Sequence, residues 1–227
     1  MVRQPTARAA ILDYGGVMAV SPLGRIHDLA VELGASREVV VETIFGGHGD
    51  GSDNPWHDLE AGRGRLDEEF ATRMQARFEP HGVRFDLPSF VHWITDAVNE
   101  PQRAVVDTVR RARAAGIPTL LLTNSVAGFR PVIEATIPVA ELFDHVLESW
   151  RIGARKPEER AYEVATETLG IDPVDCVFAD DLAVNVAAAE AIGMTGIHLI
   201  DPTDGARSIA TALGLEITVV ARRESAR

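Results

Sequence analysis

The feature that most constrains this fold is a regular alternation of short apolar runs with amphipathic helical patterns. Strands that alternate with helices pair in parallel, and uninterrupted apolar strands are those covered on both faces. The sequence therefore predicts an α/β fold with a doubly wound parallel sheet. The predicted strands lie at residues 9–12, 117–122, 143–147, 174–179 and 196–200, with helices near 101–115, 130–136, 158–169, 184–192 and 205–213.

Residues between the first strand and the remaining strands have a different texture. They carry helical spacing and no convincing strand pattern, and glycines make residues 46–64 mostly loop. We therefore predict an inserted helical cap domain at 18–97, over a core domain of 1–17 and 98–227. The predicted cap helices are 25–33, one capped by Ser36, 66–78 and 88–98.

The overall charge limits the partners of the chain. The 227 residues contain 22 Lys and Arg against 34 Asp and Glu, a net charge of −12. This excess is a poor match to nucleic acid or to an anionic membrane, so a phosphorylated small molecule would need a local positive site. A single cysteine, Cys176, excludes a disulfide framework within the chain. We expect a soluble cytoplasmic protein with no membrane span.

Polar side chains follow three of the predicted strands at the point where each strand ends. These are Asp13, the pair Thr123-Asn124 and the pair Asp180-Asp181. Ligands of open parallel sheets sit beyond the carboxyl ends of the strands, so these groups should converge on one edge. Lys156, which lies just before a predicted helix, can reach the same edge.

This set of residues suits phosphoryl chemistry. A carboxylate such as that of Asp13 can attack phosphorus and form an aspartyl-phosphate. Mg²⁺, held by Asp13, Asp181 and the carbonyl of Gly15, would keep the two anions together. The Thr123 hydroxyl and the Lys156 ammonium would hold the other phosphoryl oxygens.

The ordered segments resemble the haloacid dehalogenase (HAD) superfamily of aspartate-nucleophile hydrolases, in the branch whose helical cap follows the first strand. The resemblance implies a Rossmann-like core, Mg²⁺ dependence and, most often, phosphatase activity. The matching segments are 13–17, 120–124, 153–157 and 178–181, with Asn185 four positions beyond Asp181.

The resemblance also implies residue roles. Asp13 is the expected nucleophile, and Thr123 and Lys156 complete the expected catalytic set. The expected metal positions are Asp13, Gly15, Asp181 and Asp180, the last as a second ligand or as support. The expected phosphate-binding positions are Gly16, Thr123, Asn124 and Lys156, because amides of the Gly15-Gly16 turn can donate to an anion.

Gly15 departs from the phosphatase pattern, which usually has a second aspartate there to protonate the leaving oxygen and activate water. General acid–base help is typically worth about 10²–10⁴-fold. One explanation is a leaving group that needs little protonation, since this motif also resembles the glycine variant of glucose-1-phosphate phosphatases. A second is a proton from the cap, and a third is loss of turnover. The cap candidates are His48, Asp50, Asp53, His57 and Asp58.

The sequence thus predicts a Mg²⁺-dependent hydrolase, a phosphatase for a small phosphorylated metabolite such as a sugar phosphate. His48, Asp53, Trp56 and His57 are the predicted substrate contacts in the cap. Two alternatives stay open. A dehalogenase tolerates Gly15 because halide leaves without a proton, and a non-catalytic protein would only bind a phosphate ligand.

Overall fold

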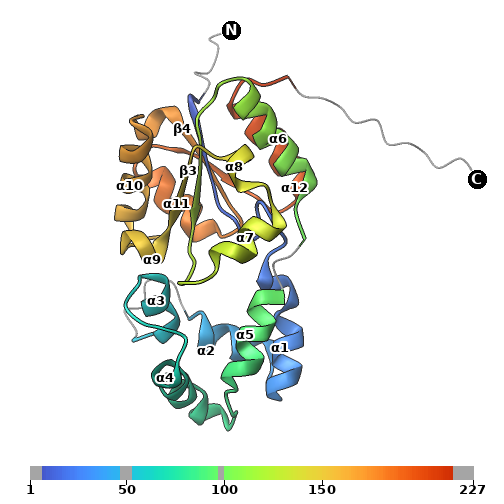
Figure 1. Ribbon diagram of the computed structural model, residues 1–227, viewed down its shortest axis with the longest axis vertical. Coiled ribbons are helices and arrows are strands. Elements are labelled where there is room, and N and C mark those ends of the chain that lie inside the picture. Colours follow the sequence, from blue (N-terminus) through green and yellow to red (C-terminus); the bar gives the residue numbers. More distant parts are fainter. Residues whose placement is uncertain (1–6, 47–52, 97–99, 217–227) are drawn as a thin grey trace, which may run out of the picture.

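A computed structural model describes residues 7–46, 53–96 and 100–216 of the chain. Its centre is a five-stranded sheet with the order β3-β2-β1-β4-β5, in which all neighbouring strands are parallel (Figure 1). This confirms the predicted α/β class. The strands are β1 (Ala9–Leu12), β2 (Thr119–Thr123), β3 (His145–Glu148), β4 (Cys176–Asp180) and β5 (Thr195–His198).

The three central strands explain the uninterrupted apolar runs. Every residue of β1, β2 and β4 is buried, whereas β3 and β5 at the edges are partly exposed. Leu12 pairs with Leu121 of β2 and with Ala179 of β4. This register brings Asp13 out of the sheet next to Asp180, and the Asp13 amide donates to the Ala179 carbonyl at 3.0 Å.

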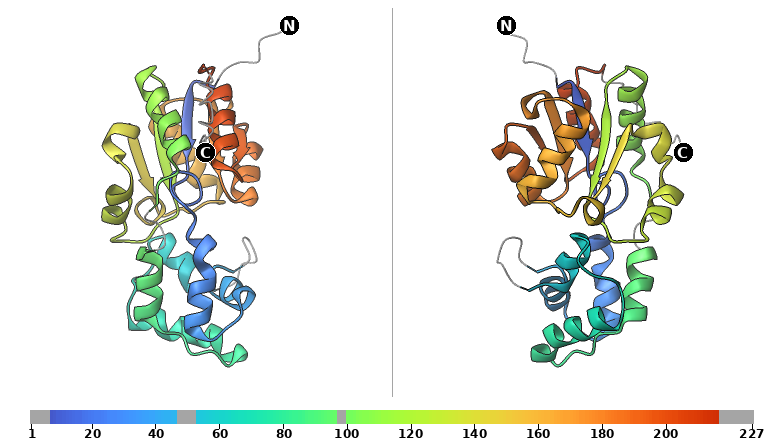
Figure 2. Two further views of the ribbon diagram at one scale, coloured as in Figure 1. Left: turned by 90° about the vertical axis from the view of Figure 1, so that its right-hand side faces the viewer. Right: turned by 60° about the vertical axis from the view of Figure 1, so that its left-hand side comes forward.

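Helices cover both faces of the sheet (Figures 1 and 2). Alternate residues of β1 face opposite cores, since Ala10 and Leu12 belong to one buried cluster and Ala9 and Ile11 to the other. Helices α6 (Arg103–Ala114), α7 (Arg130–Thr136), α8 (Val139–Leu142) and α12 (Pro202–Ala212) pack on the first cluster. Helices α10 (Glu159–Leu169) and α11 (Ala183–Ala191) pack on the second, and the short α9 (Ser149–Ile152) follows β3.

The helical cap lies beyond the carboxyl ends of the strands and has its own core (Figure 2). Phe90 is central to that core, with ring centroids 6.0 Å from Phe70 and 5.7 Å from Phe85. The cap helices are α1 (Ile26–Leu33), α2 (Arg37–Ile44), α3 (Pro55–Glu60), α4 (Glu68–Phe78) and α5 (Leu87–Asp96), with 3₁₀ turns at η1 (Pro22–Arg25) and η2 (Glu79–His81). A third 3₁₀ turn, η3 (Pro173–Asp175), precedes β4. We propose 18–97 as the cap domain, and 1–17 with 98–227 as the core domain.

Helix α3 lies in a region that the sequence predicted to be mostly loop. Its start has two recognisable signals, because the Asn54 side chain accepts a hydrogen bond from the Trp56 amide at 2.9 Å and Pro55 occupies the first turn. Glycines on both sides of this short helix hid the signals.

Two helix starts also differ from prediction. Helix α6 begins at Arg103, because Pro101 instead forms an antiparallel bridge with Ala19. Helix α12 begins at Pro202, because the Asp201 side chain caps it by accepting from two main-chain amides.

The two chain segments that join cap and core run side by side. The Val20 amide donates to the Glu100 carbonyl, and the Gln102 amide donates to the Met18 carbonyl, both at 2.9 Å. The cap is therefore attached at one place, next to the loop that follows β1. Among the helices of residues 7–46, 53–96 and 100–216, none combines the length and apolar character needed to cross a membrane.

Candidate active site

Lys156 lies at the centre of the site, between two carboxylates. Its Nζ is 2.6 Å from Asp13 Oδ1 and 2.6 Å from Asp180 Oδ2. Only 1% of the lysine side chain is exposed. The structure thus brings together three residues that the sequence predicted to converge from β1, β4 and the loop before α10.

Asp180 is fully engaged by protein donors. Its Oδ1 accepts from the Leu182 amide at 2.9 Å and from Asn185 Nδ2 at 3.0 Å, while Oδ2 accepts from Lys156. It is the last residue of β4, and its bonds to Leu182 and Asn185 tie it to the first turn of α11. This carboxylate therefore orients the lysine and the first turn of α11.

Asn124 is tied to the main chain of Lys156. The Lys156 amide donates to Asn124 Oδ1 at 2.8 Å, and Asn124 Nδ2 donates to the Lys156 carbonyl at 2.9 Å. This reciprocal pair fastens the lysine loop to the end of β2. The neighbouring Thr123 is buried and lines the cavity described below.

The two glycines after Asp13 differ in what they require. Gly16 has φ +83°, and an added Cβ would lie 2.1 Å from Asp181 Oδ2, so only glycine fits. Its amide is already used within the turn, donating to the Ala19 carbonyl at 2.7 Å. A Cβ on Gly15 would instead meet only Pro22 Cδ, at an ordinary 3.5 Å. Packing therefore does not demand glycine at position 15.

The carboxylates of Asp13, Asp180 and Asp181 form a group that fits a divalent cation. One oxygen from each lies within 4.8 Å of the others. Oxygen ligands of this kind suit Mg²⁺, and one lysine does not balance three carboxylates. Among the described residues, the buried Asn185 Oδ1 also lacks a hydrogen-bond partner, so a further oxygen at this edge is available.

The pKa values reflect this crowding of negative charge. Burial raises the pKa of Asp13 to about 8, against the opposing effect of Lys156. Burial and the neighbouring Asp180 raise the pKa of Asp181 to about 6. For Lys156, burial lowers the pKa but the two carboxylates outweigh it, so its pKa is raised. The lysine is therefore charged, and Asp13 and Asp181 hold protons more tightly than usual when no cation is bound.

A cavity of about 350 Å³ opens above these residues, between the core and the cap. Asp13, Thr123, Lys156 and Asp181 lie on its core side. The cap residues that line it are Ser21, Pro22, Leu23, Val41, Phe45, Gly46, Trp56, Glu60 and Ile94. The cavity thus joins the carboxylate group to the cap.

Trp56 lines the cavity, but the other described cap candidates do not. His57 Nε2 lies 2.7 Å from the Phe45 carbonyl, and Asp53 forms an exposed ion pair with Arg73. Asp58 pairs with Arg63 and Arg73 at 3.0 and 2.7 Å, both on the surface of the cap. His48 and Asp50 lie outside the described residues. Asp53 and His57, two of the predicted substrate contacts, thus make contacts within the cap and do not line this cavity.

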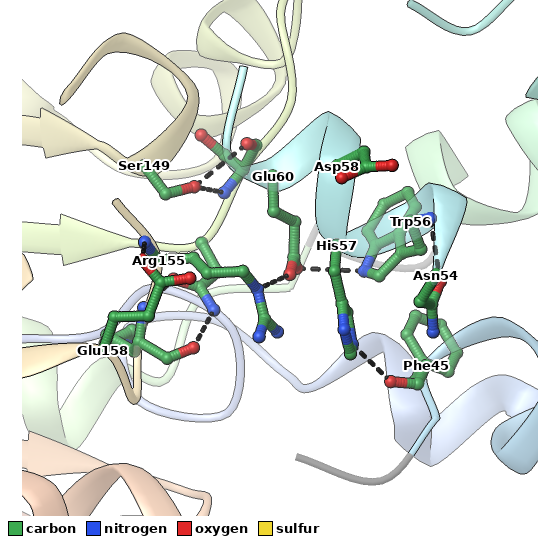
Figure 3. A network of polar contacts seen from close by, with 12 residues as sticks. Phe45, Asn54, Trp56, His57, Asp58, Glu60, Ser149, Arg155 and Glu158 are labelled. Carbon is green, nitrogen blue, oxygen red and sulfur yellow. Dashed lines mark hydrogen bonds and ion pairs between the residues drawn. The ribbon is translucent and has the colours of Figure 1, made fainter. Parts of the chain in front are cut away.

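The sequence reasoning missed an ion pair that joins cap and core in the wall of the cavity (Figure 3). Arg155 Nε donates to Glu60 Oε2 at 2.7 Å, and Trp56 Nε1 donates to Glu60 Oε1 at 2.9 Å. Only 8% of either charged side chain is exposed. Burial raises the pKa of Glu60 despite the attraction of Arg155. Glu60 ends α3, so its burial became visible only once that helix was known.

Comparison with known proteins agrees with this arrangement. A family model described as haloacid dehalogenase-like hydrolase matches residues 6–193. The chain belongs to this family. Sesquiterpene phosphatase astK of Aspergillus oryzae is 26% identical over 215 residues, covering 92% of this chain and 95% of that protein.

Two further matches are more limited. Acyl-CoA dehydrogenase family member 10 of Mus musculus is 25% identical over 217 residues, but the chain spans only 19% of its length. A HAD family enzyme from Bacteroides thetaiotaomicron, solved with magnesium and inorganic phosphate, superposes with a TM-score of 0.60 at 18% identity. That match covers 83% of this chain and 92% of the other, and it shows the shared fold.

Proposed function

We propose that this family member is a Mg²⁺-dependent phosphomonoester hydrolase with Asp13 as nucleophile. The observation that carries the proposal is the placement of Asp13 within a three-carboxylate group, with its Oδ1 held 2.6 Å from Lys156 Nζ at one end of a cavity. The sesquiterpene phosphatase relative supports a phosphatase, and the fold neighbour bound to magnesium and phosphate supports the cation.

Each residue has a part in the proposed reaction. An Asp13 oxygen forms a bond to phosphorus while the bond to the leaving oxygen breaks, and that oxygen takes a proton from water. A second water then gives a proton to the hydroxide left by the first step and attacks phosphorus, and the Asp13–phosphorus bond breaks to release inorganic phosphate and restore Asp13. Lys156 and Thr123 bind phosphoryl oxygens, while Asp180 and Asn124 hold Lys156 in position.

Bound Mg²⁺ would supply positive charge that offsets the repulsion between carboxylate and phosphate. Asp13 and Asp181 are the proposed carboxylate ligands, together with the Gly15 carbonyl. We propose that Asp180 supports the site without binding the cation directly, because both of its oxygens accept hydrogen bonds from protein donors. These assignments refine the sequence-based roles of Asp180 and Asn124.

The direct test is phosphate release from a broad panel of phosphomonoesters, with and without Mg²⁺. We expect release only with Mg²⁺, and the Asp13→Asn variant should fall to the background rate. Asp204→Asn is a matched control, because that aspartate side chain is 72% exposed on α12. No release from any ester by the intact protein would refute the proposal.

Gly15 favours one rival reaction, since it provides no acid and a halide needs none. The rival is a HAD-type dehalogenase in which Asp13 attacks carbon. Chloride release from 2-chloropropionate in the absence of Mg²⁺ would identify it. The third alternative, a phosphate-ligand-binding protein without turnover, would bind phosphate esters but hydrolyse none, even after Gly15→Asp.

A further inference from the structure

Most of the cap residues that line the cavity are apolar. Two aromatic residues among them, Phe45 and Trp56, are in edge-to-face contact with ring centroids 5.7 Å apart. Apolar residues from the core complete the same wall near the end of β2 and on α7. The apolar lining includes Val41, Phe45, Trp56 and Ile94 from the cap, and Val126 and Ile133 from the core.

The polar side chains on the cap side already have partners within the protein. Both oxygens of Glu60 accept hydrogen bonds, and its charge is balanced by Arg155. The Trp56 N–H is used by the same carboxylate, and the Ser21 hydroxyl bonds to Asp181. A ligand at this part of the wall therefore meets an apolar surface of defined shape rather than free hydrogen-bonding groups.

Among the described residues, two that line the other side of the cavity each have a buried side-chain oxygen without a hydrogen-bond partner. These atoms are Ser125 Oγ, after β2, and Asn185 Oδ1, on α11. Both belong to the core, as do Asp13 and Lys156. The cavity thus has a polar end at the carboxylate group and a mainly apolar end beneath the cap, where the charged Glu60 and Arg155 are paired with each other.

We propose that the substrate is a phosphate ester of a compact, mainly apolar alcohol, whose organic part fills the cap side of the cavity. The proposal rests on the phosphatase function proposed above. A sugar in this space would bury hydroxyl groups against apolar side chains, and each unmade hydrogen bond weakens binding. An apolar body gains from the same burial. The proposed substrate class differs from the sugar phosphate suggested by the sequence analysis.

Two esters of matched shape test the proposal. Cyclohexylmethyl phosphate and glucose 6-phosphate are both primary-alcohol esters on a six-membered ring, so they differ mainly in ring hydroxyls. We expect kcat/KM to favour the cyclohexylmethyl ester by at least about tenfold, which corresponds to about 1.4 kcal/mol. A smaller ratio, or turnover of neither ester while p-nitrophenyl phosphate is hydrolysed, would overturn the proposal.

Binding separates this proposal from the proposed function. The affinity of the Asp13→Asn variant for the two esters, measured by calorimetry with Mg²⁺, needs no turnover and should show the same tenfold preference. Equal affinities would overturn the apolar class. Absence of phosphate release from every ester, p-nitrophenyl phosphate included, would instead count against the phosphatase.

A pair of valine variants tests where the organic part lies. Val41 lines the cavity, whereas Val31, also on a cap helix, is 66% exposed. Val41→Phe should lower kcat/KM for the cyclohexylmethyl ester by at least about tenfold and leave acetyl phosphate within about twofold. Val31→Phe should change neither. Equal losses for both substrates in Val41→Phe would contradict the placement.

Discussion

The Glu60–Arg155 ion pair gives the sharpest test of how the cap is held on the core. Glu60→Gln keeps the shape of the side chain and an acceptor for Trp56, but it removes the charge that balances Arg155. Both charged side chains are only 8% exposed. Removal of one partner of a buried pair costs about 3–5 kcal/mol. Since Arg155 also borders the cavity, where water can reach it, we expect the lower end, about 3 kcal/mol.

The assay is urea unfolding of Glu60→Gln, Arg155→Met and the double variant. Circular dichroism and tryptophan fluorescence should coincide if unfolding is two-state. The double variant should lose less than the sum of the single variants by at least about 2 kcal/mol, because neither charge is then left unpaired. Glu167→Gln is the control, since it breaks an exposed pair with Arg160, and it should cost less than about 1 kcal/mol. Additivity within about 0.5 kcal/mol would refute the reasoning.

Three further predictions concern the cation, the docking of the cap and the leaving group. Folding raises the pKa of Asp13 from 3.8 to about 8, so the folded protein binds a proton that the unfolded chain has lost between these pH values. The cation-free protein should therefore become less stable as the pH rises from about 4 to about 8. Mg²⁺ should therefore raise Tm more at about pH 8 than at about pH 5, and an equal rise would argue against a carboxylate site. Gly62 has φ +73°, and an added Cβ would lie 2.3 Å from the Trp150 carbonyl oxygen. Gly62→Ala should therefore lower the unfolding free energy by about 1–2 kcal/mol through backbone strain and by about 1–3 kcal/mol more through overpacking. Gly82→Ala, with φ +65° and no atom within 4 Å, should show the strain alone, and equal unfolding free energies for the two variants would contradict this. The Gly15→Asp side chain should fit its space and speed hydrolysis of esters with poor leaving groups by about 10²-fold or more, whereas Gly15→Asn should give no such acceleration. The measurement is the ratio of the alkyl phosphate rate to the p-nitrophenyl phosphate rate, and an unchanged ratio in Gly15→Asp would contradict the prediction.

The sheet could be predicted from the sequence because its signals are local. The runs that became β1, β2 and β4 are wholly apolar, and the polar pairs at Thr123 and Asp180 mark where two of them end. Parallel topology then requires those ends to meet at one edge. The close approach of Asp13 to Lys156 and Asp180 follows from that rule, although the residues are far apart in the chain.

The cavity wall could not be predicted in the same way. Glu60 and Arg155 are 95 positions apart, and neither lies in a pattern that predicts burial. Their pairing depends on how α3 docks against the core, and α3 itself is short and flanked by glycines. Likewise, the sequence suggested phosphate binding for Asn124, and only the fold shows that its side-chain oxygen and nitrogen are both bonded to the main chain of Lys156.

The adjoining hydrogen-bonded segments at Val20 and Gln102 have a consequence for how such proteins diversify. Since the intervening chain departs and returns at neighbouring points, its replacement by a longer or shorter module leaves the strand order and the proposed nucleophile, Asp13, in place. Gln102 Nε2 also donates to the Gly16 carbonyl at 2.7 Å, so the attachment is anchored to the loop that follows Asp13. With the roles proposed above, selectivity can be exchanged as a unit while the reaction chemistry is inherited unchanged.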